Sequence, residues 1–368
     1  LLEAANEALD GKVDISRIEK LHHDTAEVLG VSKDSIDALL SELKALLTGI
    51  SMIKELTKRT KDYLVSFGER LSVRMMALYL TKDGTPAKSY DAWDVGFLSD
   101  SNFMNAELDD SVWTAIPEKL NDYKNDIQKE IPIVTGFIAK DKNGNITTLG
   151  RGGSDLSATM IGAAMHVDEV QTWKDVDGIL TADPRIVKDA KNVPFITYDE
   201  ASELAYFGSQ VLHPRAMYPV KKIKTPVHVK NSYNIEHSGS LIIPVHIETP
   251  LPVRAITAVK DIQMIEIVST HMLGASGFLA HIFNVFLKWD VSIDVIATSE
   301  VSVSLTVAGD IDLTGLLKDL NGIAMCSVQK DKAIVTIICD AVHSSAIMGE
   351  GMKSLADIGI NPDIISQG

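Results

Sequence analysis

Apolar residues recur at helical spacing through most of the first 80 residues. Between residues 14 and 80 they fall three or four positions apart, as in an amphipathic helix. The clearest run comprises Ile36, Leu39, Leu40, Leu43, Leu46 and Leu47. Gly30 and Gly49 are the expected helix stops, because glycine readily ends a helix. The pattern predicts an N-terminal helical segment.

The pattern changes after Asp83 and Gly84 to short apolar runs that alternate with helical stretches. Runs typical of strands cover residues 131–138, 169–173 and 226–229, and helical stretches cover residues 154–166 and 200–207. This alternation indicates an α/β layered sheet. Three prolines within residues 244–252 predict a linker, beyond which a second type of domain begins.

An internal repeat supports that boundary. Residues 264–268 match 333–337, and residues 291–296 match 360–365, and both pairs are 69 positions apart. Two small β-α-β units of this kind are expected to pack together or against a second subunit. The first copy continues into a strand over residues 301–307, whereas the second stops at Gly368. Residues 1–5 read as the middle of a helix, so we expect the sequence to be clipped at both ends.

Composition narrows the class of protein. The chain has 368 residues, 45% of them hydrophobic, which suits two or three domains. Its formal charge of −15 comes from acidic residues spread along the chain, which argues against nucleic acid as a partner. No apolar run reaches the roughly 18 residues of a membrane span. Cys326 and Cys339 are expected to be free thiols in a reducing compartment.

The most informative stretch is residues 147–155, in which a strand leads through three glycines into an amphipathic helix. A glycine turn before a helix exposes backbone N–H groups, and the helix dipole adds partial positive charge, so anion binding is expected. The alternative is a plain tight turn with Ser154 or Asp155 as the helix cap. The pattern is neither a Walker motif nor a dinucleotide-binding GxGxxG motif.

Residues 173–185 form a second stretch, in which a strand ends in carboxylates, a glycine turn and Arg185. The carboxyl ends of strands form the ligand crevice of open α/β sheets, so these groups suit a nucleotide with its magnesium. Ordinary turns at Asp177 and Asp183 are the alternative.

Two shorter stretches complete the set. Residues 66–70 place Glu69 after a glycine, where we expect the start of a helix and where a solvated capping charge is the plain interpretation. Residues 207–214 end in His213 and Pro214, and a packed or turn histidine is the plain interpretation there.

Together, in this order, the four stretches resemble aspartate kinases of the amino-acid kinase family over almost the whole chain. Residues 150–155 and 175–185 carry the resemblance most strongly, and residues 66–69 and 211–214 point to the aspartate branch. The C-terminal repeat resembles paired ACT domains. The resemblance implies an α/β fold in which an amino-acid-kinase-like layered αβα sheet domain over residues 1–245 precedes two ferredoxin-like (βαββαβ) ACT domains over residues 253–368. The first ACT domain is expected at about residues 263–309, and the second, from the remainder, lacks its last strand.

The resemblance implies that ATP, accompanied by Mg²⁺, phosphorylates the β-carboxylate of aspartate to 4-phospho-aspartate, the first step of lysine, threonine and methionine biosynthesis. Glu69 would hold the amino group of aspartate and Arg151 its α-carboxylate, with Ser154 in the same substrate site. Asp155 would orient cationic groups around the transferring phosphoryl, so Arg151 and Asp155 are the candidate catalytic residues. The candidate ATP-site residues are Lys174, Asp175, Leu180 through its backbone, Arg185 and Gln210.

Two departures from the family matter. The family's N-terminal Lys-Phe-Gly-Gly segment and its strand are absent, so the main catalytic cation cannot be named in this sequence. Gln210 stands where bacterial relatives carry a second lysine, and a neutral amide brings no positive charge. The expected chemistry is direct in-line transfer without a covalent enzyme intermediate, and no metal site made of protein side chains alone is expected.

Residues 272–279 and 294–301 look like the effector site of a plant-type, monofunctional, lysine-sensitive enzyme. The candidate effector residues are Met272, Ala275, Gly277, Phe278, Leu279, Asp294, Thr298, Ser299 and Glu300. Carboxylates suit the ammonium groups of lysine, and backbone N–H groups at a helix start suit its carboxylate. Solvated strand-end charges, and threonine as the effector, are the alternatives. Exposed edges of ACT sheets predict a homodimer or a dimer of dimers.

Two other functions stay open at this stage. One is a non-catalytic amino-acid sensor that uses only its ACT region. The other is the kinase part of a bifunctional enzyme fused to a homoserine dehydrogenase. The expected location is the cytoplasm, or the plastid stroma if the source is a photosynthetic eukaryote, and no membrane partner is expected.

Overall fold

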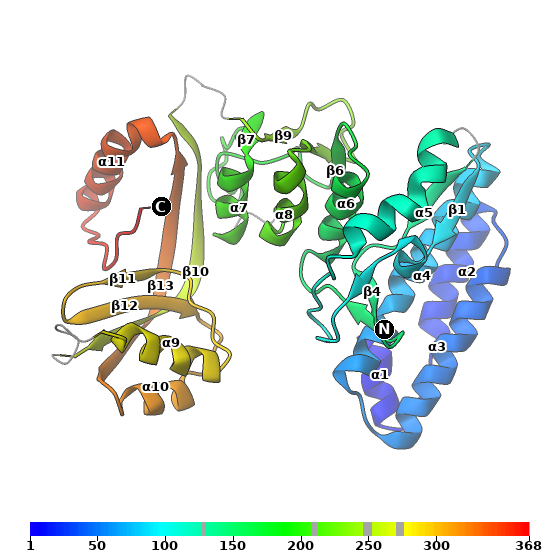
Figure 1. The fold of residues 1–368 in the computed structure, drawn as a ribbon, viewed down its shortest axis with the longest axis horizontal. Coiled ribbons are helices and arrows are strands. Elements are labelled where there is room, and N and C mark those ends of the chain that lie inside the picture. The colour runs from blue at the N-terminus through cyan, green and yellow to red at the C-terminus, as the bar shows by residue number, and fades with distance from the viewer. Residues whose placement is uncertain (127–129, 208–211, 246–251, 270–275, 368) are drawn as a thin grey trace. The chain divides into compact units, whose positions relative to one another are not determined.

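The computed structural model describes residues 1–126, 130–207, 212–245, 252–269 and 276–367. These residues fall into two compact units, and Figure 1 labels most of their elements. The described residues of the first unit lie within Leu1–Ile179, Pro194–Ala205 and Gln210–Ile247, and those of the second within Leu180–Val193, Tyr206–Ser209 and Glu248–Gly368. None of the described helices is both long enough and apolar enough to cross a bilayer.

Four helices begin the first unit, which confirms the predicted helical segment. They are α1 (Leu2–Leu9), α2 (Ser16–Leu29), α3 (Asp34–Ile53) and α4 (Lys58–Lys82). Gly30 ends α2 in the left-handed conformation, as predicted. The stop predicted at Gly49 is wrong, because α3 continues to Ile53. Leu47 and Ile50 flank that glycine and are buried, and their burial outweighs the cost of about 1 kcal/mol for a glycine inside a helix.

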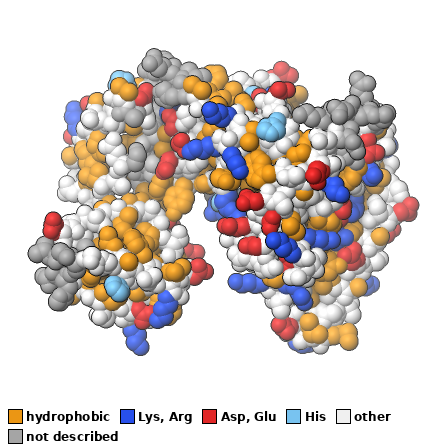
Figure 2. Space-filling view, in the orientation of Figure 1, with side chains coloured by type: hydrophobic (Ala, Val, Ile, Leu, Met, Phe, Trp, Pro, Cys, Tyr) orange, Lys and Arg blue, Asp and Glu red, His pale blue; other side chains and the backbone are white. Residues whose placement is uncertain are grey.

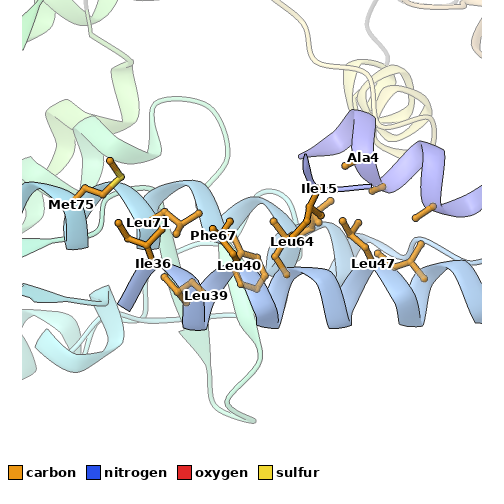
Figure 3. Packing of buried hydrophobic residues seen from close by; sticks show 14 of the residues in the cluster. Ala4, Ile15, Ile36, Leu39, Leu40, Leu47, Leu64, Phe67, Leu71 and Met75 are labelled. Carbon is orange, nitrogen blue, oxygen red and sulfur yellow. The ribbon is translucent and has the colours of Figure 1, made fainter. Parts of the chain in front are cut away.

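The apolar faces of these helices form one core (Figure 3). Leu40, Leu64 and Phe67 are buried between α3 and α4, and Ala4 and Ile15 extend the core to α1 and the segment after it. Ion pairs close one side of α4, where Arg74 pairs with Asp91 at 2.9 Å and Arg70 pairs with Glu42 at 3.2 Å. The core and these pairs fix the rotation of α4.

The position predicted for Glu69 within its helix is wrong. The glutamate lies in the middle of α4, three turns after the helix begins, rather than at a helix start. The true start is at Thr57, whose hydroxyl accepts a hydrogen bond from the N–H of Thr60 at 3.1 Å. Gly68 does not interrupt the helix, because the core residues Phe67 and Leu71 hold α4 on both sides of it. Glu69 is therefore not a solvated charge that caps a helix.

The strands of the first unit form three small sheets. A parallel pair joins β1 (Ala87–Tyr90) to β3 (Ile131–Val134); a second sheet has the order β2 (Leu98–Ser99), β4 (Ile138–Asp141), β5 (Ile146–Thr148); a third has the order β6 (Val170–Lys174), β8 (Val227–Asn231), β9 (Ser240–Ile243), β7 (Phe195–Thr197). The single run predicted over residues 131–138 is wrong. It is divided at Phe137, whose positive φ of 67° breaks the extended backbone and separates β3 from β4.

Helices alternate with these strands, which confirms the predicted α/β class. They are α5 (Val112–Asp126), α6 (Gly153–Ala164), α7 (Tyr198–Tyr206), α8 (Pro214–Ile223) and the short η1 (Ala92–Val95). Helices α6 and α8 pack against one another. Figure 2 shows acidic and basic side chains interspersed over the surface of the first unit.

The second unit is built on two long antiparallel strands, β10 (Val253–Val268) and β13 (Met325–Cys339). The sheet has the order β11 (Ile296–Thr298), β12 (Ser302–Ala308), β10, β13, and its helices are α9 (Phe278–Lys288), α10 (Thr314–Leu320) and α11 (Ser344–Asp357), with η3 (Ala341–His343) before α11. From the second half of β10 to the first half of β13, the element order is β-α-β-β-α-β, as in ferredoxin-like domains. Residues 263–309, the range predicted for the first ACT domain, contain the second half of β10, α9, β11 and β12.

The first matched segments of both sequence repeats lie in this sheet. Residues 264–268 lie in β10 and residues 333–337 lie in β13, and each long strand bends at an aspartate with φ of 57°, Asp261 or Asp331. The strand expected over residues 360–365 is not formed. In the first copy β11 pairs with β12.

Candidate active site

The turn between β5 and α6 depends on two glycines in the left-handed conformation. Gly150 has a φ of 70°, and a Cβ atom there would lie 2.5 Å from the Oδ1 of Asn105. Gly152 has a φ of 73°, and a Cβ atom there would lie 2.1 Å from the Cβ of His213. A side chain at either position would strain the backbone and displace a neighbour. The glycines therefore allow the turn to be tight and closely covered.

The first turn of α6 leaves its N-terminus available for a ligand. Gly152 is the residue before the helix, and no side chain caps it. Ser154 and Asp155 lie inside α6, which begins at Gly153, so neither is the helix cap that the plain interpretation required. Backbone N–H groups and the helix dipole attract anions at such a position.

The Asp155 carboxylate accepts a hydrogen bond from the Lys174 ammonium at 2.7 Å. Lys174 ends β6, so this ion pair joins the glycine-turn stretch to the second predicted stretch. The Asp155 side chain is 17% exposed and that of Lys174 is 28% exposed. Water and salt therefore screen this pair less than they screen a pair on the surface. The carboxylate thus fixes an ammonium close to the start of α6, where it can serve a phosphate group.

Glu69 is a half-buried carboxylate on α4 for which the described residues provide no hydrogen-bond or ion-pair partner. Burial raises the pKa of this carboxyl group. A carboxylate in this setting gains from the arrival of a cation, such as the ammonium group of an amino acid.

Asp62 precedes Glu69 by seven residues, so both lie on one face of α4. It is fully buried and accepts three hydrogen bonds: from the Thr148 hydroxyl at 2.7 Å, the Thr148 N–H at 3.0 Å and the Met104 N–H at 2.9 Å. Burial is the main cause that raises the pKa of Asp62, and the hydrogen bonds oppose it. Through Asp62, α4 is attached to the end of β5, directly before the glycine turn.

Arg215 supports the same turn from α8. Its guanidinium donates to the Leu149 carbonyl at 2.8 Å, to the Asn105 Oδ1 at 2.9 Å and to the Ala106 carbonyl at 3.1 Å. The preceding His213 ring caps α8 by accepting from the Arg215 N–H at 3.3 Å. Burial, followed by the charges of Arg151 and Arg215, lowers the pKa of His213. His213 is thus a packed histidine that covers the turn.

Sequence reasoning missed Asp62, Asn105 and Arg215. Asp62 had one detectable signal, since an acid stands among the apolar residues of a helix and shares a face with Glu69. Arg215 directly follows the predicted histidine and proline. Nothing in the sequence pattern alone identifies Asn105.

The remaining predicted residues of the first unit are less enclosed. Arg151 is exposed, with no ion-pair partner among the described residues, and Asp175 is exposed after β6. Asp177 closes a loop, because it accepts hydrogen bonds from Asn231 at 2.8 Å and Asn234 at 3.1 Å. These bonds lower the pKa of Asp177. The two hydrogen bonds support the turn interpretation for this residue.

The second unit contains two of the predicted ATP-site residues. Leu180 forms an isolated bridge with Asn192. The guanidinium of Arg185 pairs with the carboxylate of Asp183, with Nη2 2.8 Å from Oδ2, so this arginine is engaged locally. Gln210 lies outside the described residues.

The predicted effector residues lie along the second unit. Met272 and Ala275 are outside the described residues. Gly277 precedes α9 with φ of 89° and no side-chain cap, and Phe278 and Leu279 begin that helix. Ser299 shapes the turn between β11 and β12, where Thr298 ends β11 and Glu300 is exposed. Asp294 precedes β11.

The described residues contain no group of three or more histidine, cysteine, aspartate or glutamate side chains arranged to hold a metal. Lys174 and Asp155 form an ion pair beside the uncapped start of α6, where an anion is expected to bind.

The profile of the amino acid kinase family matches residues 10–231, more than half of the chain. The chain therefore belongs to the amino acid kinase family. Within that family it is similar to aspartokinases. Aspartokinase 1, chloroplastic, of Arabidopsis thaliana is 44% identical over 366 residues, which cover 96% of this chain and 64% of that protein. Lysine-sensitive aspartokinase 3 of Escherichia coli is 32% identical and covers 87% of this chain and 72% of that protein.

Solved structures agree in fold. The structure of E. coli aspartokinase III in complex with aspartate and ADP has a TM-score of 0.78 and 31% identity, and covers 91% of this chain and 75% of that one. Clostridium acetobutylicum aspartate kinase has a TM-score of 0.79 and 25% identity, and covers 99% of this chain and 81% of that one. This chain spans 64% of the length of the Arabidopsis relative.

Proposed function

We propose that this protein is an aspartate kinase, which transfers the γ-phosphoryl group of ATP to the β-carboxylate of aspartate. The observation that carries the proposal is the Lys174–Asp155 ion pair beside the uncapped start of α6, which joins the two stretches most typical of the family. The similarity to aspartokinases, one of them solved with aspartate and ADP, supports it.

The substrate would be held by complementary charges. The half-buried Glu69 carboxylate has no described partner and suits the amino group of aspartate. The exposed Arg151 guanidinium suits its α-carboxylate as a planar, bidentate partner, with the Ser154 hydroxyl beside it. The β-carboxylate is then free to react.

In the reaction, a β-carboxylate oxygen attacks the γ-phosphorus of ATP, and the bond from that phosphorus to the oxygen bridging to ADP breaks. The products are 4-phospho-aspartate and ADP, and no proton has to be transferred. Lys174, oriented by Asp155, would neutralise charge that develops on phosphate oxygens. Mg²⁺ would arrive with ATP and be held largely by the phosphates.

The test is an assay of ADP release with the intact protein, ATP and aspartate. Arg151→Ala should raise the KM for aspartate by about tenfold to a hundredfold, because it removes a charged hydrogen-bond donor, while the KM for ATP changes less. Arg17→Ala, at an arginine whose side chain is 90% exposed, is the control and should leave both constants unchanged. A larger effect of Arg151→Ala on ATP would move Arg151 to the nucleotide site, and absence of aspartate-dependent turnover in the parent would refute the proposal.

Regulation by lysine is the second part of the proposal. It rests on the carboxylates Asp294 and Glu300 and the uncapped start of α9 in the second unit, and on similarity to the lysine-sensitive E. coli relative. A homodimer, or a dimer of dimers, is inferred from the second unit's sheet, which ends in the edge strand β13, and from α11, which has no buried residue. The chloroplastic relatives support a plastid location.

A further inference from the structure

Asp294 has an unusual set of partners within the second unit. Its Oδ1 accepts a hydrogen bond from the Tyr206 hydroxyl at 3.1 Å. Its Oδ2 is buried and has no hydrogen-bond partner among the described residues. A buried carboxylate oxygen without a donor costs free energy, which the arrival of a donor recovers. The carboxylate is therefore held on one side and vacant on the other.

The backbone around Asp294 is fixed by β12. The Asp294 N–H donates to the Thr306 carbonyl at 2.9 Å, and the Val295 N–H donates to the Thr306 hydroxyl at 3.1 Å. These bonds place the residue but leave the torsion angles of its side chain free. The Tyr206 hydroxyl is the described group that determines which oxygen faces which way.

Tyr206 is itself held in place. It is the last residue of α7, and its ring packs edge-on against Phe207 with 5.0 Å between the ring centroids. The Phe207 carbonyl accepts a hydrogen bond from the Thr257 hydroxyl of β10 at 2.8 Å. The hydroxyl of Tyr206 is thus presented to Asp294 by a segment that β10 anchors.

We propose that Tyr206 is a positioning residue of the effector site: its hydroxyl holds Oδ1 of Asp294, so that Oδ2 is presented to an ammonium group of the effector amino acid. The proposal rests on the proposed regulation by lysine. Because the tyrosine occupies Oδ1, an ammonium can donate a charge-assisted hydrogen bond to Oδ2 without displacing it. Because Oδ2 is buried, the groups that cover it must move when the effector binds, which links binding to a local change of conformation.

The test compares Tyr206→Phe with the parent in the intact protein, by calorimetric titration with lysine. The phenylalanine keeps the ring but removes the hydroxyl, so lysine should bind about threefold to tenfold more weakly, the worth of one hydrogen bond. Tyr218→Phe, at a tyrosine that is 63% exposed, is the matched control and should bind lysine as the parent does. Turnover of Tyr206→Phe without lysine should stay within about twofold of the parent, as expected for a substitution outside the catalytic groups.

Two further measurements separate positioning from a merely structural role. In an Asp294→Asn background, Tyr206→Phe should have no additional effect on lysine binding, because the two residues act as one unit. The pH below which lysine binding is lost should be higher in Tyr206→Phe than in the parent, because the carboxylate has lost a donor that favours its charged form. Unchanged or tighter lysine binding by Tyr206→Phe, additive effects in the double variant, or no lysine binding by the parent would overturn the inference. A parent that binds lysine in this tyrosine-dependent way but does not phosphorylate aspartate would refute the kinase proposal alone.

Discussion

Asp62 in the first unit and Asp294 in the second are both carboxylates whose pKa is raised by burial, but their oxygens are satisfied in different ways. Asp62 accepts three hydrogen bonds from Thr148 and Met104. Asp294 accepts one, from Tyr206, and its second oxygen is buried without a described donor. The difference shows that burial alone does not mark a ligand site. A fully bonded carboxylate such as Asp62 joins parts of the fold, whereas the unpartnered oxygen of Asp294 is one to which we propose that a ligand donates.

Asp155 is intermediate between these two. It is partly buried and paired with a mobile type of side chain, the Lys174 ammonium, rather than with backbone groups. Its partner can interact with phosphate oxygens at the same time, because an ammonium has three donors. The three carboxylates therefore predict three different phenotypes: loss of turnover, loss of stability and loss of regulation.

The largest effect is expected for Asp155→Asn. The amide keeps the shape but no longer anchors Lys174 by charge, so kcat should fall by about 10²–10³-fold, the range found when one preorganised electrostatic contact is removed. The free energy of unfolding should change by less than about 1 kcal/mol. Steady-state kinetics and urea unfolding measure the two quantities. Wild-type turnover in this variant would show that Asp155 is only a structural residue of α6.

The next effect is expected for Asp62→Ala. The substitution leaves the N–H and hydroxyl of the buried Thr148, and the N–H of Met104, without an acceptor, so the free energy of unfolding should fall by about 2–3 kcal/mol. Asp199→Ala is the control, because that carboxylate is 77% exposed and pairs with Lys221 on the surface, where it should be worth less than about 1 kcal/mol. Equal losses of unfolding free energy in both variants would show that the buried Asp62 stabilises the fold no more than a surface carboxylate does.

The smallest effect concerns the pH dependence of lysine inhibition. Only the ionised form of Asp294 attracts an ammonium, so lysine affinity should fall as pH drops through the pKa of this group. Because burial raises that pKa above its ordinary value, the loss should begin at a higher pH than for an exposed aspartate. Asp294→Asn should bind lysine about tenfold more weakly at neutral pH and lack this pH dependence. Inhibition curves from neutral to mildly acidic pH decide the matter, and a dependence that persists in the variant would assign it to another group.

The hydrophobic pattern predicted much of the fold. The helical segment, the α/β alternation and the strands β6, β8 and β12 follow from periodicity and short apolar runs, which record burial directly. The break at Phe137 and the continuation of α3 through Gly49 were not predictable, because both are decided by tertiary packing around a single residue. The full length of β13 was likewise not predictable, since it depends on pairing with β10.

The site was predictable in part. The glycine turn, Lys174 and Asp155 lie in stretches whose residue types indicate their chemistry. The ion pair between Lys174 and Asp155 joins residues 19 positions apart and is seen only in the structure. Asp62 and Arg215 form hydrogen bonds with groups far along the chain, 86 positions away for Asp62 and Thr148 and 110 for Arg215 and Asn105. Contacts of that range leave no local pattern. The assignments of Glu69, Arg151 and the effector residues remain predictions.

The pairing of β10 with β13 along nearly their whole length has a consequence for how the second unit unfolds. Pairing runs from Val253 with Cys339 to Val268 with Met325, so both halves of the unit share the same two strands. One half contains α9, β11, β12 and α10, and the other contains α11. Because unpairing the strands in one half also disrupts the other, we expect the two halves to unfold in one step. Amide hydrogens along both strands should exchange with solvent at similar slow rates, with faster exchange at Asp261 and Asp331, where the register shifts.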